Sequence, residues 1–93
     1  MWVLPVYQYR HEWQVRHQQL LDFQSAIKPV LQSDPKFQFV YCGQYTGGRR
    51  GCLGGFVDST NDLERMQVIY SMMISNHPAR VEFRVKIDKH ILN

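Results

Sequence analysis

The sequence predicts an α+β fold in which four strands and two helices follow one another in the order βαββαβ. Three observations carry this prediction. A glycine-bearing hairpin lies within residues 36–58, an amphipathic helical segment stands on each side of it, and a cleanly alternating strand pattern ends the chain. With 93 residues, of which 44% are hydrophobic, the chain is expected to form one domain over residues 1–93.

Residues 2–9 have the composition of a strand. Apolar residues fill both alternating positions of this segment, with Val3, Tyr7 and Tyr9 on one of its two faces. A strand that is apolar on both faces belongs in the middle of a sheet. Pro5 cannot donate a hydrogen bond to a neighbouring strand, so we expect a bulge or an unpaired position there.

Residues 11–33 predict an amphipathic helix. Pro29 removes one helical hydrogen bond, so we expect a kink or a short restart of the helix near this residue. The sequence Ser33-Asp34-Pro35 is typical of an exit turn. The residues of the apolar stripe recur at helical spacing and are Trp13, Leu20, Phe23, Ile27, Val30 and Leu31.

Residues 37–45 and 52–57 predict two strands, and residues 46–51 predict the turn between them. Aromatic and β-branched side chains favour strands, and glycine pairs permit the positive φ angles of a tight reversal. Cys42 and Cys52 could face each other across this hairpin only if the turn were centred on Gly47. Free thiols are expected in a reducing compartment.

Residues 58–62 predict the start of the second helix. Asn61 with Glu64, or Ser59 with Asp62, can form a capping box, and acidic residues suit the positive end of a helix. The helix is expected to end near an Asn-His-Pro sequence, because Asn tolerates left-handed geometry and the residue before proline leaves the helical region.

The last segment alternates between apolar and charged residues and predicts a strand at a sheet edge. Val81, Phe83, Val85 and Ile87 are expected on one face, and Glu82, Arg84, Lys86 and Asp88 on the other. The six elements together predict a ferredoxin-like sandwich, a four-stranded antiparallel sheet with both helices on one face. The uncovered apolar face then predicts an interface or a ligand site.

The second half of the chain resembles the dimeric α+β barrel superfamily, which includes the muconolactone-isomerase-like, stress-responsive A/B barrel and antibiotic-biosynthesis monooxygenase families. The resemblance rests on Gly54-Gly55-Phe56-Val57-Asp58-Ser59, on Leu63, on His77-Pro78 and on the final alternating strand. It implies a homodimer whose two sheets enclose a small apolar or aromatic organic ligand. It also implies isomerase, cyclase or monooxygenase chemistry without a cofactor.

Chemistry of this kind needs an acid or base whose pKa is tuned by burial. The candidate catalytic residues are His77, Tyr7 and Tyr41, with His11, Tyr9 and Glu82 as further acid–base candidates, and the candidate ligand-binding residues are Tyr9, Phe39, Phe56 and Arg84. His77 also suits the end of a helix, and the tyrosines also suit a core. His11 and His17 are six residues apart and do not share a helix face, so no metal site is expected.

Two other functions fit the sequence. The segment around Arg49-Arg50-Gly51 resembles the third-strand signature of the RNA-recognition motif, but Cys52 stands where the first stacking aromatic is required, so nucleic-acid binding is not expected. A protein-binding or inhibitory module of viral or mobile-element type could use the basic hairpin tip to dock an acidic partner. The sequence has neither a membrane-spanning run nor an N-terminal signal pattern, which predicts a cytoplasmic location.

Overall fold

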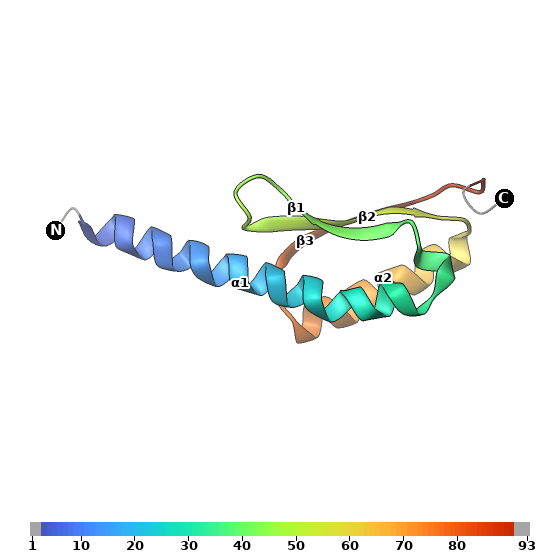
Figure 1. Ribbon diagram of the computed structural model, residues 1–93, viewed down its shortest axis with the longest axis horizontal. Helices are drawn as coiled ribbons and strands as arrows, with labels where there is room; N and C mark the ends of the chain where they lie inside the picture. The colour runs from blue at the N-terminus through green and yellow to red at the C-terminus, as the bar shows by residue number, and fades with distance from the viewer. Residues whose placement is uncertain (1–2, 91–93) are drawn as a thin grey trace.

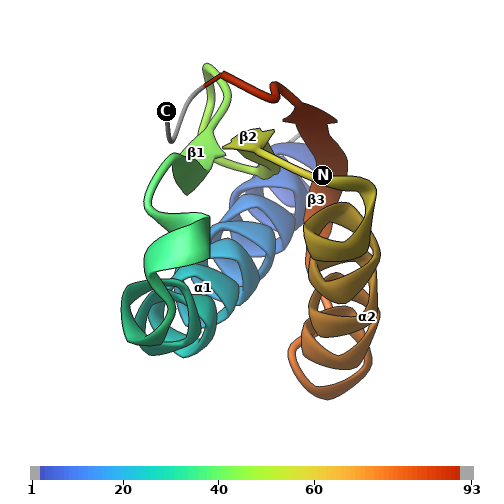
Figure 2. The same cartoon turned by 90° about the vertical axis from the view of Figure 1, so that its right-hand side faces the viewer.

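The computed structural model describes the backbone of residues 3–90 and the side chains of residues 11–90. Its elements are α1 (Val3–Ser33), the 3₁₀ turn η1 (Pro35–Phe37), β1 (Val40–Gln44), β2 (Arg50–Val57), α2 (Thr60–Asn76) and β3 (Arg80–Ile87). Figure 2 shows both helices side by side on one face of the sheet. The α+β class and the covering of one sheet face by two helices are therefore as predicted.

The sheet has three strands in the order β1-β2-β3. β1 pairs with β2 in antiparallel fashion, and β3 pairs with β2 in parallel. The predicted four-stranded antiparallel sheet is therefore wrong for the described residues. In the ferredoxin-like arrangement the N-terminal strand would lie between β2 and β3 and run antiparallel to both, whereas here β3 pairs directly with β2.

The N-terminal segment is helical, so the strand predicted for residues 2–9 is wrong over the part that the structure describes. A single helix, α1, runs from Val3 to Ser33 and projects beyond the sheet (Figure 1). Extending an existing helix costs little, because each added residue gains a hydrogen bond after nucleation elsewhere. Pro5 lies in the first helical turn, where a backbone N–H has no helical acceptor, so its missing donor does not oppose the helix.

Two other boundaries differ from the sequence prediction. α1 is continuous through Pro29, so the predicted restart does not occur. Phe37 lies in η1 rather than in the first hairpin strand, and its side chain is buried. Asp34 caps this turn by accepting a hydrogen bond from the Lys36 backbone N–H at 2.9 Å. The predicted exit turn at Ser33-Asp34-Pro35 is confirmed.

The hydrophobic core lies between the helices and the sheet. Leu20, Phe23 and Ile27 of α1 are fully buried, as the predicted stripe requires. The other core residues are Phe37, Val40, Leu53, Val57, Met66, Val81 and Val85. The alternation predicted for β3 is confirmed, because Val81 and Val85 are buried while Glu82, Arg84 and Lys86 are exposed.

Gly51 allows α1 to approach the sheet closely. A Cβ atom at this position would lie 2.8 Å from Leu20 Cδ1 and 2.3 Å from the Gly43 carbonyl oxygen. Contacts this short cannot be accommodated without moving the β1 backbone. A glycine is therefore required where Leu20 enters the core.

The hairpin tip is fastened to α1 by two side chains. Trp13 Nε1 donates a hydrogen bond to the Gly47 carbonyl at 2.7 Å, and His17 Nδ1 lies 2.8 Å from the Gly48 carbonyl. The two rings stack with centroids 4.8 Å apart. The tip glycines adopt positive φ angles, 98° at Gly47 and 70° at Gly48, as the turn prediction expects.

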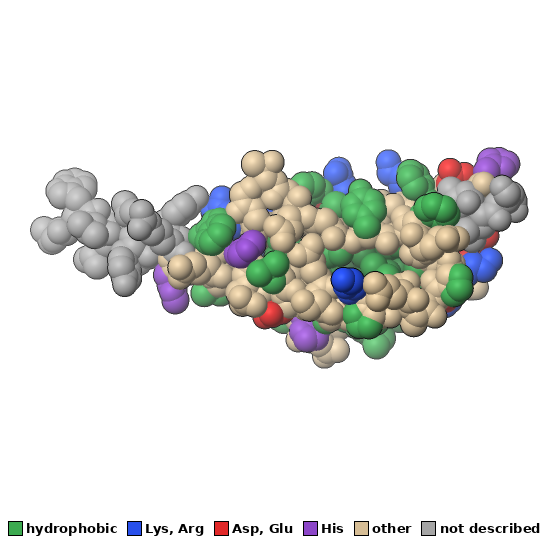
Figure 3. Space-filling model, viewed as in Figure 1, with side chains coloured by type: hydrophobic (Ala, Val, Ile, Leu, Met, Phe, Trp, Pro, Cys, Tyr) green, Lys and Arg blue, Asp and Glu red, His purple; other side chains and the backbone are tan. Residues whose placement is uncertain are grey.

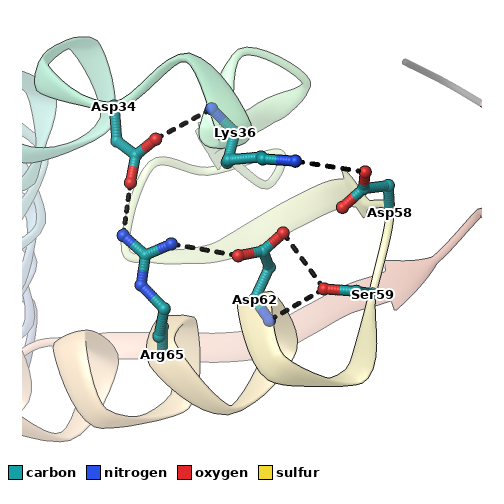
Figure 4. A network of polar contacts seen from close by, with 6 residues as sticks. All are labelled: Asp34, Lys36, Asp58, Ser59, Asp62 and Arg65. Carbon is teal, nitrogen blue, oxygen red and sulfur yellow. Dashed lines mark hydrogen bonds and ion pairs between the residues drawn. The ribbon is translucent and has the colours of Figure 1, made fainter. Parts of the chain in front are cut away.

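A polar network fixes the start of α2 against the end of α1 (Figure 4). Ser59 caps the helix by accepting a hydrogen bond from the Asp62 backbone N–H at 3.2 Å, so the Ser59–Asp62 capping pair is confirmed. Arg65 bonds Asp62 at 3.0 Å and also Asp34. Its guanidinium lies 4.9 Å from the centroid of the Phe37 ring. This network joins the α1–β1 connection to the β2–α2 connection.

Replacing Phe23 by Ala tests the core assignment. Phe23 is fully buried, so Phe23→Ala should lower the free energy of unfolding by about 3–5 kcal/mol in a urea titration. Phe56 is 44% exposed on the other side of the sheet, so Phe56→Ala should cost only about 1 kcal/mol. Equal losses for the two variants would contradict the placement of the core on the helix side.

The charge of Asp62 should stabilise the fold only above its folded pKa. Burial raises this pKa, but hydrogen bonds, among them those from Ser59 and Arg65, and the charge of Lys36 hold it below the ordinary value of 3.8. A carboxyl with a lowered folded pKa contributes stability above its unfolded pKa and loses it as the pH falls through the folded value. Wild type should therefore have a higher urea midpoint than Asp62→Asn at pH 7, and the midpoints should converge as the pH is taken below 3.8. A gap that stays constant with pH would show that the carboxylate charge is not responsible.

Candidate functional site

The sheet face turned away from the helices, called the open face below, carries the candidate site. Side chains alternate along a strand, so this face takes the residues that lie between the core residues of each strand. It consists of Tyr41, Gly43 and Tyr45 on or next to β1, Arg50, Cys52, Gly54 and Phe56 on β2, and Arg80, Glu82, Arg84 and Lys86 on β3. Figure 3 shows hydrophobic and cationic side chains together along the upper margin of the molecule, over the sheet.

The strand register arranges this face in rows that run from an aromatic side to a cationic side. Tyr41 of β1 is opposite Gly54 of β2, which in turn is beside Arg84 of β3. In the next row Phe56 is beside Lys86. The open face thus presents aromatic groups over β1 and β2, and positive charge over β3.

The open face holds most of the excess positive charge of the chain. Its cations are Arg50, Arg80, Arg84 and Lys86, and the acidic residues at the same alternating positions are Glu82 and, directly after β3, Asp88. Four cations and two carboxylates leave two positive charges on this face, out of a formal net charge of +3 for the whole sequence. The basic character of the chain is therefore concentrated on this face.

A hollow of about 670 Å³ lies on the open face. The side chains that give it chemical character are those of Tyr41, Tyr45, Cys52, Phe56, Arg84 and Lys86. This volume is within the range of about 300–1,000 Å³ that holds small-molecule ligands. Aromatic walls and convergent cations on one surface can bind a ring by stacking and a negative group by ion pairing.

Gly54 forms the floor on which the Tyr41 side chain rests. A Cβ atom at Gly54 would lie 3.1 Å from the Tyr41 hydroxyl oxygen and 3.2 Å from its Cζ. Any larger residue would lift the ring off the sheet. The Tyr41 side chain nevertheless remains 57% exposed, so its outer surface is available to a ligand.

A hydrogen-bonded chain crosses the open face at the other end of the hollow. The Tyr45 hydroxyl donates to Glu82 Oε2 at 3.1 Å and accepts from Arg84 Nη1 at 3.2 Å, and Arg84 Nε lies 3.6 Å from the same carboxylate. Burial and the bond to Glu82 raise the pKa of Tyr45 above its ordinary value. Arg50 lies over the Tyr45 ring at 5.9 Å from its centroid. Glu82 therefore orients Arg84, and Tyr45 is held as a neutral phenol.

The two cysteines lie on opposite faces of the sheet. Cys42 is opposite Leu53, and Cys52 is opposite Gly43, so the hairpin is not centred on Gly47. Both thiols are free, as expected for that register. Cys42 packs against the core, and burial, with a contribution from nearby Cys52, raises its pKa to about 11. Cys52 instead lines the hollow.

The structure brings three of the predicted site residues together and separates the others from them. Tyr41, Phe56 and Arg84 all line the hollow. Phe39 is 46% exposed and lies beside Phe56, whose backbone N–H donates to the Phe39 carbonyl at 3.1 Å, but Phe39 is not part of the hollow. His77 caps the C-terminal end of α2 and does not line it either.

Tyr7 and Tyr9 belong to α1, and their side chains are outside the described residues. Their assignment to the sheet followed from the N-terminal strand, which is wrong over the described part of that segment. Their predicted roles in a sheet-lined pocket therefore have no basis in the fold.

Sequence reasoning missed Tyr45, Cys52 and Lys86 as members of the site. A signal for each was present, because Tyr45 shares its alternation with Tyr41, and Lys86 with Arg84. Cys52 was considered as a cross-hairpin partner of Cys42 and as a missing aromatic, but not as a member of the site. The strand–helix–strand order predicts that the last two strands run parallel, but their direct pairing, which aligns Lys86 with Phe56, was missed because a fourth strand was expected in the sheet.

The described residues offer little support for other kinds of site. No group of three or more His, Cys, Asp or Glu residues among them is arranged to hold a metal ion. Within the same part of the chain, neither helix combines the length and the apolar character needed to cross a membrane. Comparison with protein-family models, with curated proteins and with solved structures finds no match to this chain. The open face is therefore the feature of the described residues from which a function can be inferred.

Proposed function

We propose that this protein is a binding module that holds a small aromatic molecule carrying a negative charge in the hollow of the open face. The observation that carries the proposal is the convergence of Tyr41, Phe56 and Arg84 on one hollow. A ring stacks between the exposed aromatic side chains, and the charged group pairs with Arg84 and Lys86. This keeps the aromatic ligand expected from the sequence and adds an anionic group to it.

The anionic group follows from the charge of the face. An uncharged ligand would leave the cations near the hollow without a partner other than Glu82, which already pairs with Arg84 at 3.6 Å. Charge-assisted hydrogen bonds are stronger than neutral ones, and arginine can bind a carboxylate or phosphate with two parallel bonds. Both considerations favour an anion over a neutral aromatic compound.

Binding rather than turnover is proposed because the hollow has no group suited to acid–base catalysis near neutral pH. None of the described residues that line it is His, Asp or Glu. The Tyr45 phenol has a raised pKa and is held by Glu82 and Arg84. His77, the strongest catalytic candidate in the sequence, lies at the end of α2.

The homodimer expected from the sequence is compatible with this proposal if ligands lie between the two sheets. If two open faces paired without a ligand, the four cations of each protomer would lie in one interface. These cations are Arg50, Arg80, Arg84 and Lys86. Charged residues are depleted from the centres of interfaces because their desolvation is costly. A closed, barrel-like dimer would therefore need anionic ligands between its sheets.

Ligand protection of Cys52 tests the proposal, with Cys42 as an internal control. In the free protein, iodoacetamide should modify Cys52 faster than Cys42, because partial burial raises the pKa of the Cys42 thiol to about 11. The aromatic anion 2-naphthoate should slow alkylation of Cys52 and leave Cys42 unchanged, as read by mass spectrometry. Cyclohexanecarboxylate, which has the charge without the ring, and 2-naphthalenemethanol, which has the ring without the charge, should protect much less.

Matched variants locate the effect in the hollow. Arg84→Ala should weaken the naphthoate protection by about tenfold or more, since a charge-assisted hydrogen bond contributes about 1.5–3 kcal/mol. Arg16→Ala removes a cation of α1 that pairs with Glu12 and does not line the hollow, and it should leave protection unchanged. Protection of Cys52 that is equal in both variants, or no protection at all, would rule out the proposed site.

A further inference from the structure

We propose that the natural ligand of the open face is a single-stranded nucleic acid, whose bases stack on Tyr41 and Phe56 and whose phosphates follow β3. This inference rests on the proposed function and names the ligand class, because a nucleotide is an aromatic ring joined to an anion. Stacking on a protein aromatic contributes to binding for every base, since each base has a π-face. Tyr41 and Phe56 are 57% and 44% exposed, so each can accept a base.

The dimensions of the open face favour a strand over an isolated nucleotide. The face extends over seven residues of β3, from Arg80 to Lys86, and the six steps between them span about 20 Å at a rise of about 3.3 Å per residue. Arg80, Arg84 and Lys86 point from this strand toward the same side. An isolated nucleotide fills the hollow, whereas a short strand would engage the cations along the whole length.

The separation of aromatic and cationic groups matches a strand lying along the sheet. The Tyr41 row runs from β1 across Gly54 to Arg84, and neighbouring strands are about 4.8 Å apart. Bases would thus lie over β1 and β2, with the phosphate backbone about 10 Å away over β3. Cβ atoms at Gly43 and Gly54 would lie 3.5 Å and 3.1 Å from the Tyr41 side chain, so these glycines let its ring lie against the sheet.

The aromatic platforms differ from those expected of the RNA-recognition signature. Cys52 does replace an aromatic on β2, which is why the sequence alone did not favour nucleic acid. Tyr41 supplies a platform from the neighbouring strand, and Gly54 lets its ring lie across β2 at 3.1 Å from the position a Cβ would occupy. The stacking surface is therefore displaced by one strand and is still present.

Duplexes should bind less well than single strands. Stacking on Tyr41 and Phe56 requires unstacked bases with a free face, and the paired bases of a duplex offer none. A duplex would retain only its phosphate contacts. This gives the test a nucleic-acid control with the same charge chemistry.

The experiment measures the fluorescence anisotropy of labelled oligouridine and oligothymidine of about eight nucleotides at several salt concentrations. Both should bind more tightly than uridine monophosphate, and a duplex of similar length should bind more weakly. With three to four phosphates engaged, log K should fall with log salt at a slope of about −2 to −3. Tighter binding of oligouridine would indicate RNA as the natural ligand, and tighter binding of oligothymidine would indicate DNA.

Variants of the open face separate stacking from loose electrostatic attraction. Tyr41→Ala should weaken binding by about fivefold or more at every salt concentration without changing the slope. Arg84→Ala should weaken binding and reduce the slope by about 0.7. Arg16→Ala removes a cation of α1 that pairs with Glu12 and does not line the hollow, so it should change neither the affinity nor the slope by more than the loss of a distant charge. Tyr41→Leu, which keeps an apolar side chain, guards against a folding defect and should show the same loss.

Glu82→Gln provides a gain-of-affinity test that does not depend on damage to the protein. It removes the carboxylate that pairs with Arg84, so oligonucleotide affinity should rise. Oligonucleotides that bind no better than uridine monophosphate, while 2-naphthoate still protects Cys52, would overturn the nucleic-acid inference and leave the small-ligand proposal standing. Failure of both ligands would overturn both proposals. An oligonucleotide affinity that is the same in wild type, Tyr41→Ala and Tyr41→Leu would also overturn the inference.

Discussion

Both helices cover the same face of the sheet, and the rest of this structure depends on the fact that the other face has no helix to cover it. Leu20, Phe23 and Ile27 of α1, with Met66 of α2, are fully buried on the covered face. The other face receives no helix, so its side chains must be compatible with water or with a ligand. Tyr41 and Phe56, both partly exposed, and a set of cations occupy it. The core therefore lies on the face that the helices cover, and the candidate site lies on the face that they leave uncovered.

The glycines of β2, together with the pairing of β3 with β2, connect those two faces of the sheet. Gly51 points to the helix side, where a Cβ would lie 2.8 Å from Leu20 Cδ1, and Gly54 points to the open side, where it would lie 3.1 Å from the Tyr41 hydroxyl. One strand thus admits a helix on one face and an aromatic ring on the other. The parallel alignment of β3 then places Arg84 beside Gly54. The hollow needs all three features.

Electrostatics divides the molecule in the same way. Asp34, Asp62 and Arg65 satisfy one another at the junction of the helices (Figure 4), so these charges contribute to the fold. The cations of β3 face outward, and Glu82 forms an ion pair with one of them, Arg84. Charges that serve structure are paired near the core, and the unbalanced ones gather over the sheet.

Local patterns in the sequence predicted those parts of the fold that depend on neighbouring residues. The Ser59–Asp62 cap, the end of α2 near Asn76 and the alternation of β3 were all predicted because short-range geometry decides them. The N-terminal segment could not be assigned in this way. Its apolar residues satisfy a buried strand and a helix equally well, and only the docking of β3 beside β2 removes the place for a fourth strand there.

The same distinction explains the candidate site. Tyr41 was named as an acid–base candidate, and Phe56 and Arg84 as ligand-binding candidates, because of their chemical types and their places on predicted strands; all three line the hollow. Their assembly into one hollow depends on the register between three strands, which no local pattern encodes. His77 was misleading because its place beside a proline also suits a helix end, which is the role it has.

The central claim is that the open face is uncovered in the free chain and receives the ligand. A titration of the amide NMR spectrum with 2-naphthoate tests this claim most directly. The account predicts chemical-shift changes at amides around the hollow, such as those of Gly54, Phe56 and Arg84, with the α2 amides unchanged. Changes concentrated on α2, or on the seam between α1 and β1, would contradict it.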